Sequence, residues 1–377
     1  MAETGSRPSA PSNVGVVGAG VMGRDIAGLF AAAGSAVTLV DVDESALVDA
    51  RRALGGRIPA ELEAAGLGGE GDLGSAVSFA EDVSGLAEAS IVVEAVPDRL
   101  PLKRAVVDDL EAVLTADALL ATNTSSLTAA DLAVDASHPE RIVLFHFANP
   151  AIPRELVEIA GDAARAPALR RAERAARAIG KRPIRLARER RGNGLSRLSA
   201  AIKCAASWEL TRTSAAEIDH AARAIGFDRG PIELIDRIGI DVHLATVDNL
   251  ADEHGDRFDP PPGVRERLER LESAGHLGRK AGRGLLEWRE GEPVYPAVEG
   301  DYDVTPVLAA LVNEAHRLVH DGIADADTVD EILRRGSGGS VGPFDLEAML
   351  GRESVTETLA GRYDATGAGV FAPAVDG

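Results

Sequence analysis

The sequence has very little cysteine and no obvious metal-binding cluster. Its single cysteine, Cys204, among 377 residues excludes an intramolecular disulfide framework and a cysteine-rich zinc site, and is what a reducing cytosol permits. We expect Cys204 to be a packed thiol. No cluster of histidine, aspartate and glutamate at metal-ligand spacing is found, so no metal is expected.

Basic charge is also scarce. The 40 lysines and arginines are outnumbered by 60 aspartates and glutamates, which gives a formal net charge of −20. A protein that binds the phosphate backbone needs a dense footprint of basic side chains, so nucleic acid is not expected as a partner. The acidic residues are spread over the whole chain, which is typical of a solvated surface.

Long hydrophobic runs are missing too. No apolar stretch approaches the roughly 18 to 20 residues that a spanning helix needs. The first twelve residues, MAETGSRPSAPS, lack the apolar segment of a signal peptide and predict a flexible tail over 1–12. We therefore expect a soluble, cytoplasmic protein with no membrane partner. Its length predicts two or three domains.

The chain after the tail shows a regular alternation of strands and helices. The apolar run over 14–17 predicts a strand, helical spacing of apolar residues follows, and 37–40 predicts a second strand. Further strands are predicted at 91–93, 118–121, 142–145 and 156–159, with helical stretches such as 102–114 between them. This alternation predicts an α/β domain over 13–190 that is built on a doubly wound, mainly parallel sheet.

After about residue 188 the pattern becomes helical. We predict a helical domain over 191–298 and a second one over 299–377. The pairs Gly230-Pro231 and Gly342-Pro343 lie 112 residues apart, and each follows a helix rich in acidic residues and precedes an acidic-apolar helix start. The second helical domain is therefore predicted to repeat the first.

A glycine motif lies between the first strand and the first helix. Gly18, Gly20 and Gly23 form G-x-G-x-x-G, in which the glycines permit a tight turn, approach to a pyrophosphate and close packing of helix on strand. Asp41 follows Gly23 by 18 residues at the end of the second strand, where a carboxylate can accept hydrogen bonds from both ribose hydroxyls. Asp41 would repel a 2′-phosphate, so the motif favours NAD over NADP.

A second motif, FHFANP, places His146 at the end of the strand predicted at 142–145. Ligands of open α/β sheets bind beyond the carboxyl ends of the strands, so His146 is expected to face the cleft. A histidine is a suitable base for an alcohol proton, provided that a carboxylate orients it. Glu158 is the candidate carboxylate because its strand can return alongside. A purely structural histidine is the open alternative.

These residues resemble the 3-hydroxyacyl-CoA dehydrogenase family, from about Val14 to about Gly351. GVVGAGVMG resembles the family's cofactor loop, VVEAVPD the strand and turn under the nicotinamide ribose, and NTSSL, at 123–127, the substrate-facing loop. HFANP corresponds to H-F-F-N-P and LVEIA to L-V-E-V, while GRKAGRGLLEW and the Gly-Pro pairs resemble the helical C-terminal region. The resemblance implies a Rossmann-type domain and NAD-dependent hydride transfer at C3 of a 3-hydroxyacyl thioester in fatty acid metabolism, most simply a short-chain substrate such as 3-hydroxybutyryl-CoA.

The resemblance also assigns roles to residues. His146 would be the general base paired with Glu158, Ser125 would hydrogen-bond the reacting oxygen, and Asn149 would help to hold the site. The implied cofactor contacts are Gly18, Gly20, Val21, Met22, Gly23, Asp41, Val42, Ala95, Val96, Asp98, Lys103, Asn123 and Ser125. Ser125, His146 and Ser196 would face the substrate. Two alternatives stay open: Ser126 can take the place of Ser125, and Asp98 with Lys103 can be a surface ion pair.

The chain departs from the family's pattern at two places. Ser196 stands where the family has asparagine in G-F-x-x-N-R-L, and the shorter serine weakens the expected carbonyl contact. In the helical stretch after Asp41, the segment ARRALGGRIPAELEAAG at 50–66 has arginines at 51, 52 and 57 but lacks the lysines and serines that family members offer to the CoA phosphates. An acyl group on the phosphopantetheine arm of an acidic carrier protein is therefore an alternative substrate.

Two further questions follow from the resemblance. A protein that binds NAD without catalysis is a second alternative, which the full set of Ser125, His146, Asn149 and Glu158 argues against. The family's single-unit members form a dimer through the helical region, and in its fused relatives a second copy occupies the partner's place. This chain is therefore expected to be either a monomer with an internal pseudo-dimer or a homodimer.

Overall fold

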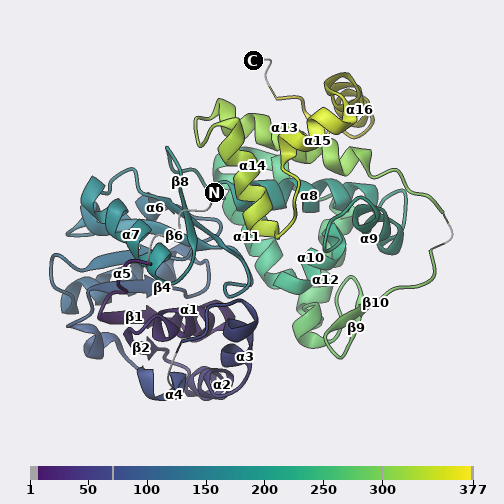
Figure 1. Ribbon diagram of the computed structural model, residues 1–377. Helices are drawn as coiled ribbons and strands as arrows, with labels where there is room; N and C mark the ends of the chain where they lie inside the picture. Colours follow the sequence, from purple (N-terminus) through teal and green to yellow (C-terminus); the bar gives the residue numbers. More distant parts are fainter. Residues whose placement is uncertain (1–6, 70–71, 299, 375–377) are drawn as a thin grey trace. The chain divides into compact units, whose positions relative to one another are not determined.

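The computed structural model describes residues 7–69, 72–298 and 300–374. The chain divides into two compact units, the first ending at Asn193 and the second beginning at Gly194 (Figure 1). Part of the tail predicted over 1–12 lies outside the described residues, and 7–11 form neither helix nor strand.

The first unit is built on an eight-stranded sheet in the order β3-β2-β1-β4-β5-β6-β7-β8. The strands are β1 Asn13–Val17, β2 Ala36–Val40, β3 Val77–Ala80, β4 Ile91–Glu94, β5 Leu119–Thr122, β6 Ile142–Phe147, β7 Leu156–Ala160 and β8 Arg182–Arg185. All neighbours run parallel except β6 and β7, which are antiparallel. The predicted doubly wound, mainly parallel sheet is confirmed.

Two strands of this sheet were not part of the sequence prediction. β3 and β8 are the two edges of the sheet, and each carries partly or fully exposed side chains instead of a continuous apolar run. β8 also contains Pro183, which cannot donate a ladder hydrogen bond and is tolerated at an edge. Edge strands of this kind leave little hydrophobic signal.

Among the described residues, seven α-helices connect the strands of this unit. They are α1 Val21–Ala32, α2 Glu44–Leu54, α3 Arg57–Ala64, α4 Leu73–Ala76, α5 Leu100–Val113, α6 Ala129–Ala133 and α7 Ala166–Ala178. The helix predicted at 102–114 starts two residues earlier, because Pro101 suits a first turn, where its missing N–H would have no intrahelical partner.

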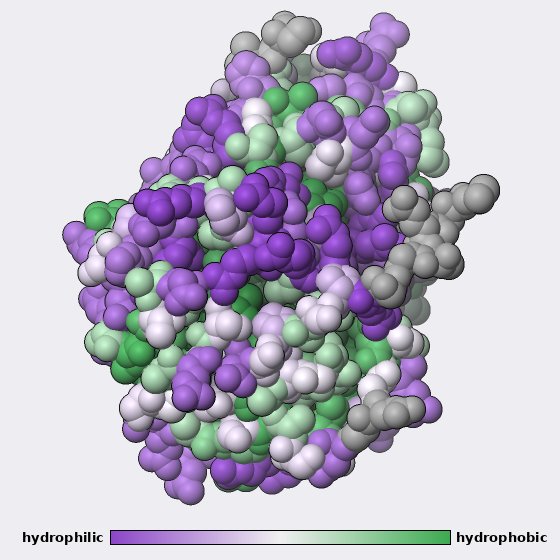
Figure 2. Space-filling view, turned by 60° about the vertical axis from the view of Figure 1, so that its left-hand side comes forward, coloured by the Kyte–Doolittle hydropathy of each residue, from purple (hydrophilic) through white to green (hydrophobic). Residues whose placement is uncertain are grey.

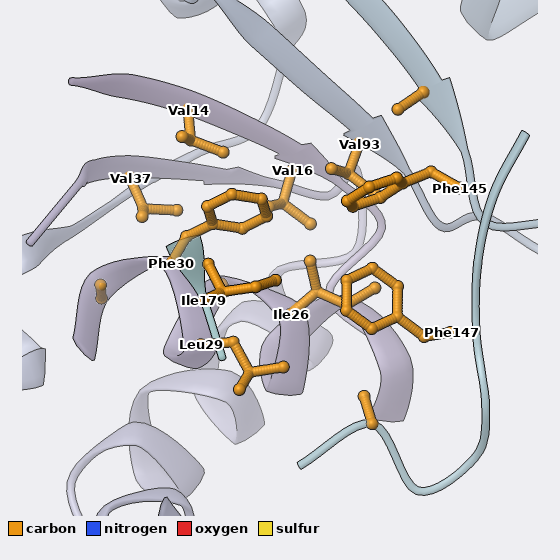
Figure 3. Packing of buried hydrophobic residues seen from close by; sticks show 14 of the residues in the cluster. Val14, Val16, Ile26, Leu29, Phe30, Val37, Val93, Phe145, Phe147 and Ile179 are labelled. Carbon is orange, nitrogen blue, oxygen red and sulfur yellow. The ribbon is translucent and has the colours of Figure 1, made fainter. Parts of the chain in front are cut away.

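The hydrophobic core fixes α1 against the sheet (Figure 3). Ile26 and Phe30 of α1 are fully buried and pack in one cluster with Val16 of β1. Phe145 and Phe147 of β6 belong to the same cluster, with ring centroids 5.1 Å apart at 84°. This packing places the N-terminus of α1 at the carboxyl ends of the strands, where ligands of such sheets bind.

The second unit is mostly helical, as predicted. Its helices are α8 Leu195–Glu209, α9 Ala215–Ala224, α10 Pro231–Ile238, α11 Ile240–His254, α12 Pro262–Ser273, α13 Thr305–His320, α14 Ala326–Ser337, α15 Pro343–Leu350 and α16 Arg352–Thr366. It also contains a hairpin of β9 Glu287–Arg289 and β10 Glu292–Val294, which the sequence analysis did not predict. Glu290 and Gly291 both have positive φ, which is the conformation of a tight two-residue hairpin turn.

The lone cysteine lies inside this unit. Cys204 of α8 is buried, and its thiol donates to the carbonyl oxygen of Asp259 at 3.3 Å. Burial raises the pKa of this thiol. Cys204 is therefore a packed, unreactive thiol, as expected.

The two Gly-Pro pairs have one structural cause. Asp219 of α9 accepts hydrogen bonds from two backbone N–H groups in the first turn of α10, at 2.8 and 2.9 Å. Asp330 of α14 accepts one from the first turn of α15, at 2.8 Å. A Cβ atom at Gly230 or Gly342 would lie 2.1 or 2.3 Å from the capping carboxyl carbon, so only glycine fits. The division of the helical part at 298 stays a prediction, and residue 299 lies outside the described residues.

A buried charge cluster joins α8 to α13. The guanidinium of Arg197 is fully buried and donates to Glu314 at 2.6 Å and to Asp321 at 2.8 Å. Burial opposes its charge, but the two carboxylates outweigh burial and raise the pKa of Arg197. Both carboxylates come from α13 or the residue that ends it, so the guanidinium of Arg197 depends on the later helices for its charge partners.

The surface has mixed polarity. On the face drawn in Figure 2, some areas are strongly hydrophilic, and others consist mostly of weakly polar and hydrophobic residues. Within the described residues, no helix is both long enough and apolar enough to cross a membrane.

We predict that Glu314→Ala lowers the free energy of unfolding of the second unit by about 3–5 kcal/mol, because it leaves the buried Arg197 without its closest partner. Urea unfolding followed by tryptophan fluorescence measures this, since both tryptophans of the sequence, Trp208 and Trp288, lie in the second unit. Glu266→Ala removes an exposed ion pair with Arg270 and serves as the control, with an unchanged midpoint. An unchanged midpoint for Glu314→Ala would show that the cluster does not stabilise this unit.

Candidate active site

The glycine motif forms the turn between β1 and α1, and two of its glycines are sterically required. Gly18 has φ 102°, and a Cβ there would lie 2.8 Å from the carbonyl of Ala95. A Cβ at Gly23 would lie 1.7 Å from the carbonyl oxygen of Gly18, so helix and turn pack backbone against backbone. At Gly20 a Cβ would meet nothing within 4 Å. Gly20 therefore borders open space in front of the helix, and the motif fits a pyrophosphate there.

The N-terminus of α1 has the charge that a phosphate group requires. Gly20 is its N-cap, no side chain caps the helix, and the first turn holds no acidic residue. The N–H groups of the first turn and the positive end of the dipole of this 12-residue helix therefore face that open space. Val21 is 53% exposed beside it, and Met22 is partly buried.

The carboxylate of Asp41 lies next to the glycine turn. One of its carboxylate oxygens accepts from the backbone N–H of Ala19 at 2.7 Å, and the other accepts from Asp43 at 2.9 Å. Each oxygen keeps a further lone pair for a ribose hydroxyl. Val42, which follows, is 90% exposed and offers an apolar contact at the same edge. These residues fit the adenosine end of a dinucleotide.

His146 and Glu158 face each other across the antiparallel pair β6 and β7. They are directly opposed in the register, and Nδ1 of His146 lies 2.7 Å from a carboxylate oxygen of Glu158. Both side chains are buried, at 6% and 0% exposed. A carboxylate that holds Nδ1 leaves Nε2 as the ring nitrogen for proton exchange with a ligand. β6 continues to Phe147, so His146 lies within the strand and not after it, because pairing with β7 prolongs the ladder.

Two asparagines of the predicted set lie at the same ends of strands. Asn123 follows β5, and its carbonyl oxygen accepts from the N–H of Phe147 at 2.9 Å, which ties β5 to β6. Asn149 is exposed in the segment after β6. No side-chain hydrogen bond joins it to the other predicted residues in the part of the chain that the structure describes.

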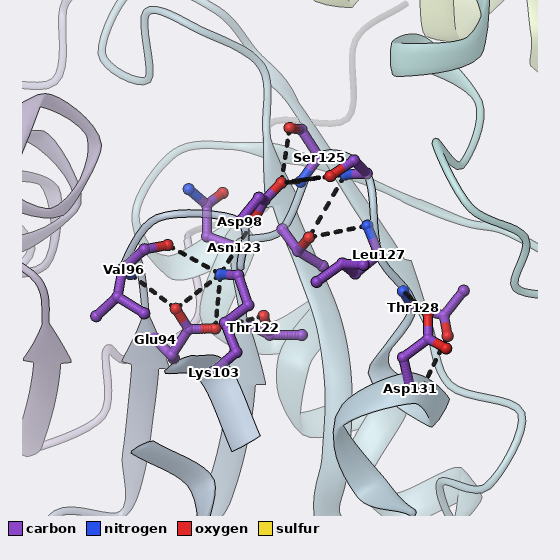
Figure 4. A network of polar contacts seen from close by, with 12 residues as sticks. Glu94, Val96, Asp98, Lys103, Thr122, Asn123, Ser125, Leu127, Thr128 and Asp131 are labelled. Atoms are coloured by element: carbon purple, nitrogen blue, oxygen red, sulfur yellow. Dashed lines mark hydrogen bonds and ion pairs between the residues drawn. The ribbon is translucent and has the colours of Figure 1, made fainter. Parts of the chain in front are cut away.

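Lys103 belongs to a buried network and not to a surface ion pair (Figure 4). Its ammonium is fully buried and lies 2.8 and 2.9 Å from the two oxygens of Glu94, 3.0 Å from the carbonyl of Val96 and 3.1 Å from Asp98. Burial alone would lower the pKa of Lys103, but the charges of Glu94 and Asp98 outweigh burial and raise it. The surface-pair interpretation of Asp98 and Lys103 is therefore wrong, since four acceptors enclose the ammonium.

The sequence analysis missed Glu94. It closes the apolar strand β4, is fully buried, and also accepts from Thr122 at 2.7 Å. A signal was present, because an acidic residue in a buried strand requires a buried cation. Lys103 lies nine residues on, in the helix that follows, and is that cation.

Asp98 also holds the loop that contains Ser125. Its Oδ2 accepts from the backbone N–H and the hydroxyl of Ser125, at 2.9 and 3.0 Å, and from those of Ser126, at 3.2 and 3.0 Å. Ser126 is fully buried, whereas Ser125 is partly exposed. The geometry therefore favours Ser125 over Ser126 as the serine that a ligand reaches. Ser196 lies in the first turn of α8, in the second unit, beside the buried Arg197.

The comparisons with known proteins assign the chain to a family. The model described as 3-hydroxyacyl-CoA dehydrogenase, NAD binding domain, matches residues 13–190. The model of the C-terminal domain matches 195–288 and again 302–375. The chain belongs to the 3-hydroxyacyl-CoA dehydrogenase family. It is an NAD-dependent oxidoreductase.

Solved structures resemble it over both units. A 3-hydroxybutyryl-CoA dehydrogenase from Escherichia coli has a TM-score of 0.80 with 23% identity over 97% of each chain, which shows the fold. Mycobacterium tuberculosis FadB2 is 31% identical, with a TM-score of 0.66, over 74% of this chain and 100% of its own. The (S)-3-hydroxybutyryl-CoA dehydrogenase PaaH1 from Ralstonia eutropha is 28% identical, with a TM-score of 0.65, over 74% of this chain and 100% of its own.

The position of Asp41 predicts the effect of reversing its charge. Asp41→Arg removes two acceptors for the ribose and supplies a cation for a 2′-phosphate, so we expect the ratio of kcat/KM with NAD to that with NADP to fall by about tenfold or more. Steady-state kinetics with both cofactors measures this ratio. Asp49→Arg makes the same charge change on the exposed side of α2 and is expected to leave the ratio unchanged. An unchanged ratio for Asp41→Arg would show that Asp41 does not face the ribose.

Proposed function

We propose that this enzyme interconverts 3-hydroxyacyl and 3-oxoacyl thioesters, with short-chain CoA esters such as 3-hydroxybutyryl-CoA as substrates. The observation that carries the proposal is the buried pair of His146 and Glu158, directly opposed at 2.7 Å. The carboxyl ends of the same sheet carry the glycine turn and the loop of Ser125. The similarity to a 3-hydroxybutyryl-CoA dehydrogenase at 28% identity supports the substrate class.

The mechanism follows from the donors and acceptors of these residues. Nε2 of His146 takes the proton of the substrate's 3-hydroxyl group. The carboxylate of Glu158 accepts the hydrogen bond from Nδ1 and stabilises the positive charge that develops on the ring. Ser125 holds the reacting oxygen. Asn149 is proposed to help hold the site and the nicotinamide side, and Ser196 to contact the substrate. Bound NAD supplies the acceptor for the hydride that leaves C3.

The arginines of α2 and α3 bear on the carrier-protein alternative. Arg57 is paired with Asp25 at 2.5 Å and with Glu61 at 2.6 Å, and Arg52 is paired with Asp49 at 2.7 Å. Arg51 lies over the ring of Phe79. Residues 44–64 contain three arginines and four acidic residues, so the two helices offer no excess of positive charge to an acidic carrier. The charge balance therefore gives no support to an acidic carrier, and it offers no positive charge to the CoA phosphates either. The preference for the CoA thioester rests on the similarity to a 3-hydroxybutyryl-CoA dehydrogenase.

We predict that His146→Ala abolishes thioester-dependent formation of NADH, with kcat at least about 100-fold lower, while NAD still binds. Glu158→Gln keeps the shape of the side chain but removes the charge behind the imidazole, and is expected to lower kcat by a similar order. The absorbance of NADH measures turnover on 3-hydroxybutyryl-CoA, and calorimetry measures NAD binding. His220→Ala, which changes an exposed histidine of α9, is the control. Full activity in His146→Ala would contradict the proposed base.

The substrate class is tested by offering the same acyl group as a CoA thioester and as a thioester of an acyl carrier protein. We expect 3-hydroxybutyryl-CoA to be turned over with a kcat/KM at least tenfold higher than the same acyl group on an acyl carrier protein. If the enzyme turned over the carrier-protein thioester but no CoA thioester, the substrate class would be the carrier-protein thioester and not the CoA thioester.

A further inference from the structure

Asp98 is the central acceptor of the Ser125 loop. One of its carboxylate oxygens receives hydrogen bonds from four donors, the backbone N–H and hydroxyl groups of Ser125 and Ser126, at 2.9 to 3.2 Å (Figure 4). The other oxygen faces the ammonium of Lys103 at 3.1 Å. Both oxygens of the carboxylate therefore meet hydrogen-bond donors. An ionised carboxylate suits this environment, because it accepts only.

Buried charges keep Asp98 ionised and in place. Burial would raise the pKa of Asp98, but the charge of Lys103 and the hydrogen bonds from the Ser125 loop outweigh burial and lower it. Lys103 is held in turn by Glu94, which also accepts from the N–H of Val96 at 2.7 Å. The chain of contacts runs from β4 through α5 to the loop after β5, so the position of the loop is set by buried ion pairs.

This arrangement fixes the position of one hydroxyl group. The carboxylate of Asp98 accepts from both the backbone N–H and the hydroxyl of Ser125, at 2.9 and 3.0 Å, so main chain and side chain are held to the same oxygen. Ser126 has the same contact, but its side chain is fully buried. Ser125 is partly exposed, so its Oγ is the hydroxyl oxygen on this carboxylate that a ligand can meet.

We propose that Asp98 is a positioning residue that acts through Ser125, fixing the place of its Oγ. The inference rests on the proposed function, in which Ser125 holds the reacting oxygen. It differs from the role that the family resemblance implies for Asp98, a contact with the nicotinamide ribose. A positioning role affects substrate turnover through Ser125, whereas a ribose contact affects the binding of NAD.

Asp98→Asn is the decisive substitution. Whichever way the amide is turned, its NH2 group faces either the serine donors or the ammonium of Lys103, so two donors meet. We expect kcat/KM for 3-hydroxybutyryl-CoA to fall about tenfold or more, with the Kd of NAD within about twofold of the wild type. In a Ser125→Ala background the same substitution should change kcat/KM by less than about twofold, because the group through which Asp98 acts is gone.

Asp98→Glu and Asp131→Asn complete the test. Asp98→Glu keeps the charge and is expected to restore most of the activity lost in Asp98→Asn. If Asp98→Asn does not fold, Asp98→Ala, which removes the carboxylate without adding a donor, measures the coupling in the wild-type and Ser125→Ala backgrounds. Asp131→Asn alters the cap of the next helix, α6, where the carboxylate of Asp131 accepts from the N–H of Thr128 at 3.1 Å. Any fall in kcat/KM that it causes should be the same in the wild-type and the Ser125→Ala backgrounds.

Three outcomes would overturn the inference. Independent, multiplicative effects of Asp98→Asn and Ser125→Ala would show that Asp98 does not act through Ser125. A loss of NAD affinity as large as the loss of kcat/KM would assign Asp98 to the cofactor, and wild-type activity in Asp98→Asn would remove any role. A wild-type enzyme without activity on any 3-hydroxyacyl thioester refutes the proposed function instead, so the two failures are distinct.

Discussion

The antiparallel pairing of β6 with β7 decides what chemistry the first unit can perform. In an otherwise parallel sheet, this reversal sets a buried carboxylate directly opposite a buried imidazole, so that Glu158 holds Nδ1 of His146 at 2.7 Å. Direct opposition across a ladder fixes both side chains with little conformational freedom left to lose. The proposed base is therefore oriented by Glu158, which the strand ladder places opposite it before any ligand binds.

The other parts of the site are held to the same ends of the strands by short polar links. Asp41 bonds the glycine turn to the end of β2, Asn123 bonds the end of β5 to β6, and the network of Glu94, Lys103 and Asp98 bonds β4 to the Ser125 loop. Each link joins elements that are distant in sequence. Such a preorganised site does not have to be assembled when the ligands arrive.

Each unit contains a buried ion-pair cluster, and the two clusters lie in different surroundings. In the first unit, Lys103 lies between two carboxylates beneath the serine loop. In the second, Arg197 follows Ser196 in the first turn of α8 and is neutralised by Glu314 and Asp321. A buried cation without its partner strongly destabilises the fold. Each cluster therefore favours the packing in which the elements that carry the cation and its carboxylates lie together.

The sequence by itself determined the alternation of strands and helices and the glycine turn followed by Asp41, because periodicity and motif spacing are local properties of a chain. It named Glu158 only as the candidate partner of His146, and the antiparallel pairing of β6 with β7 placed the two residues opposite each other. The sequence also marked the Gly-Pro pairs, whose glycines are required by the capping aspartates. Only the tertiary structure decided that Lys103 is enclosed, that Glu94 is its partner and that Ser125 is more accessible than Ser126. Those facts depend on which elements lie side by side and how deeply they are buried, and no spacing along the chain encodes burial.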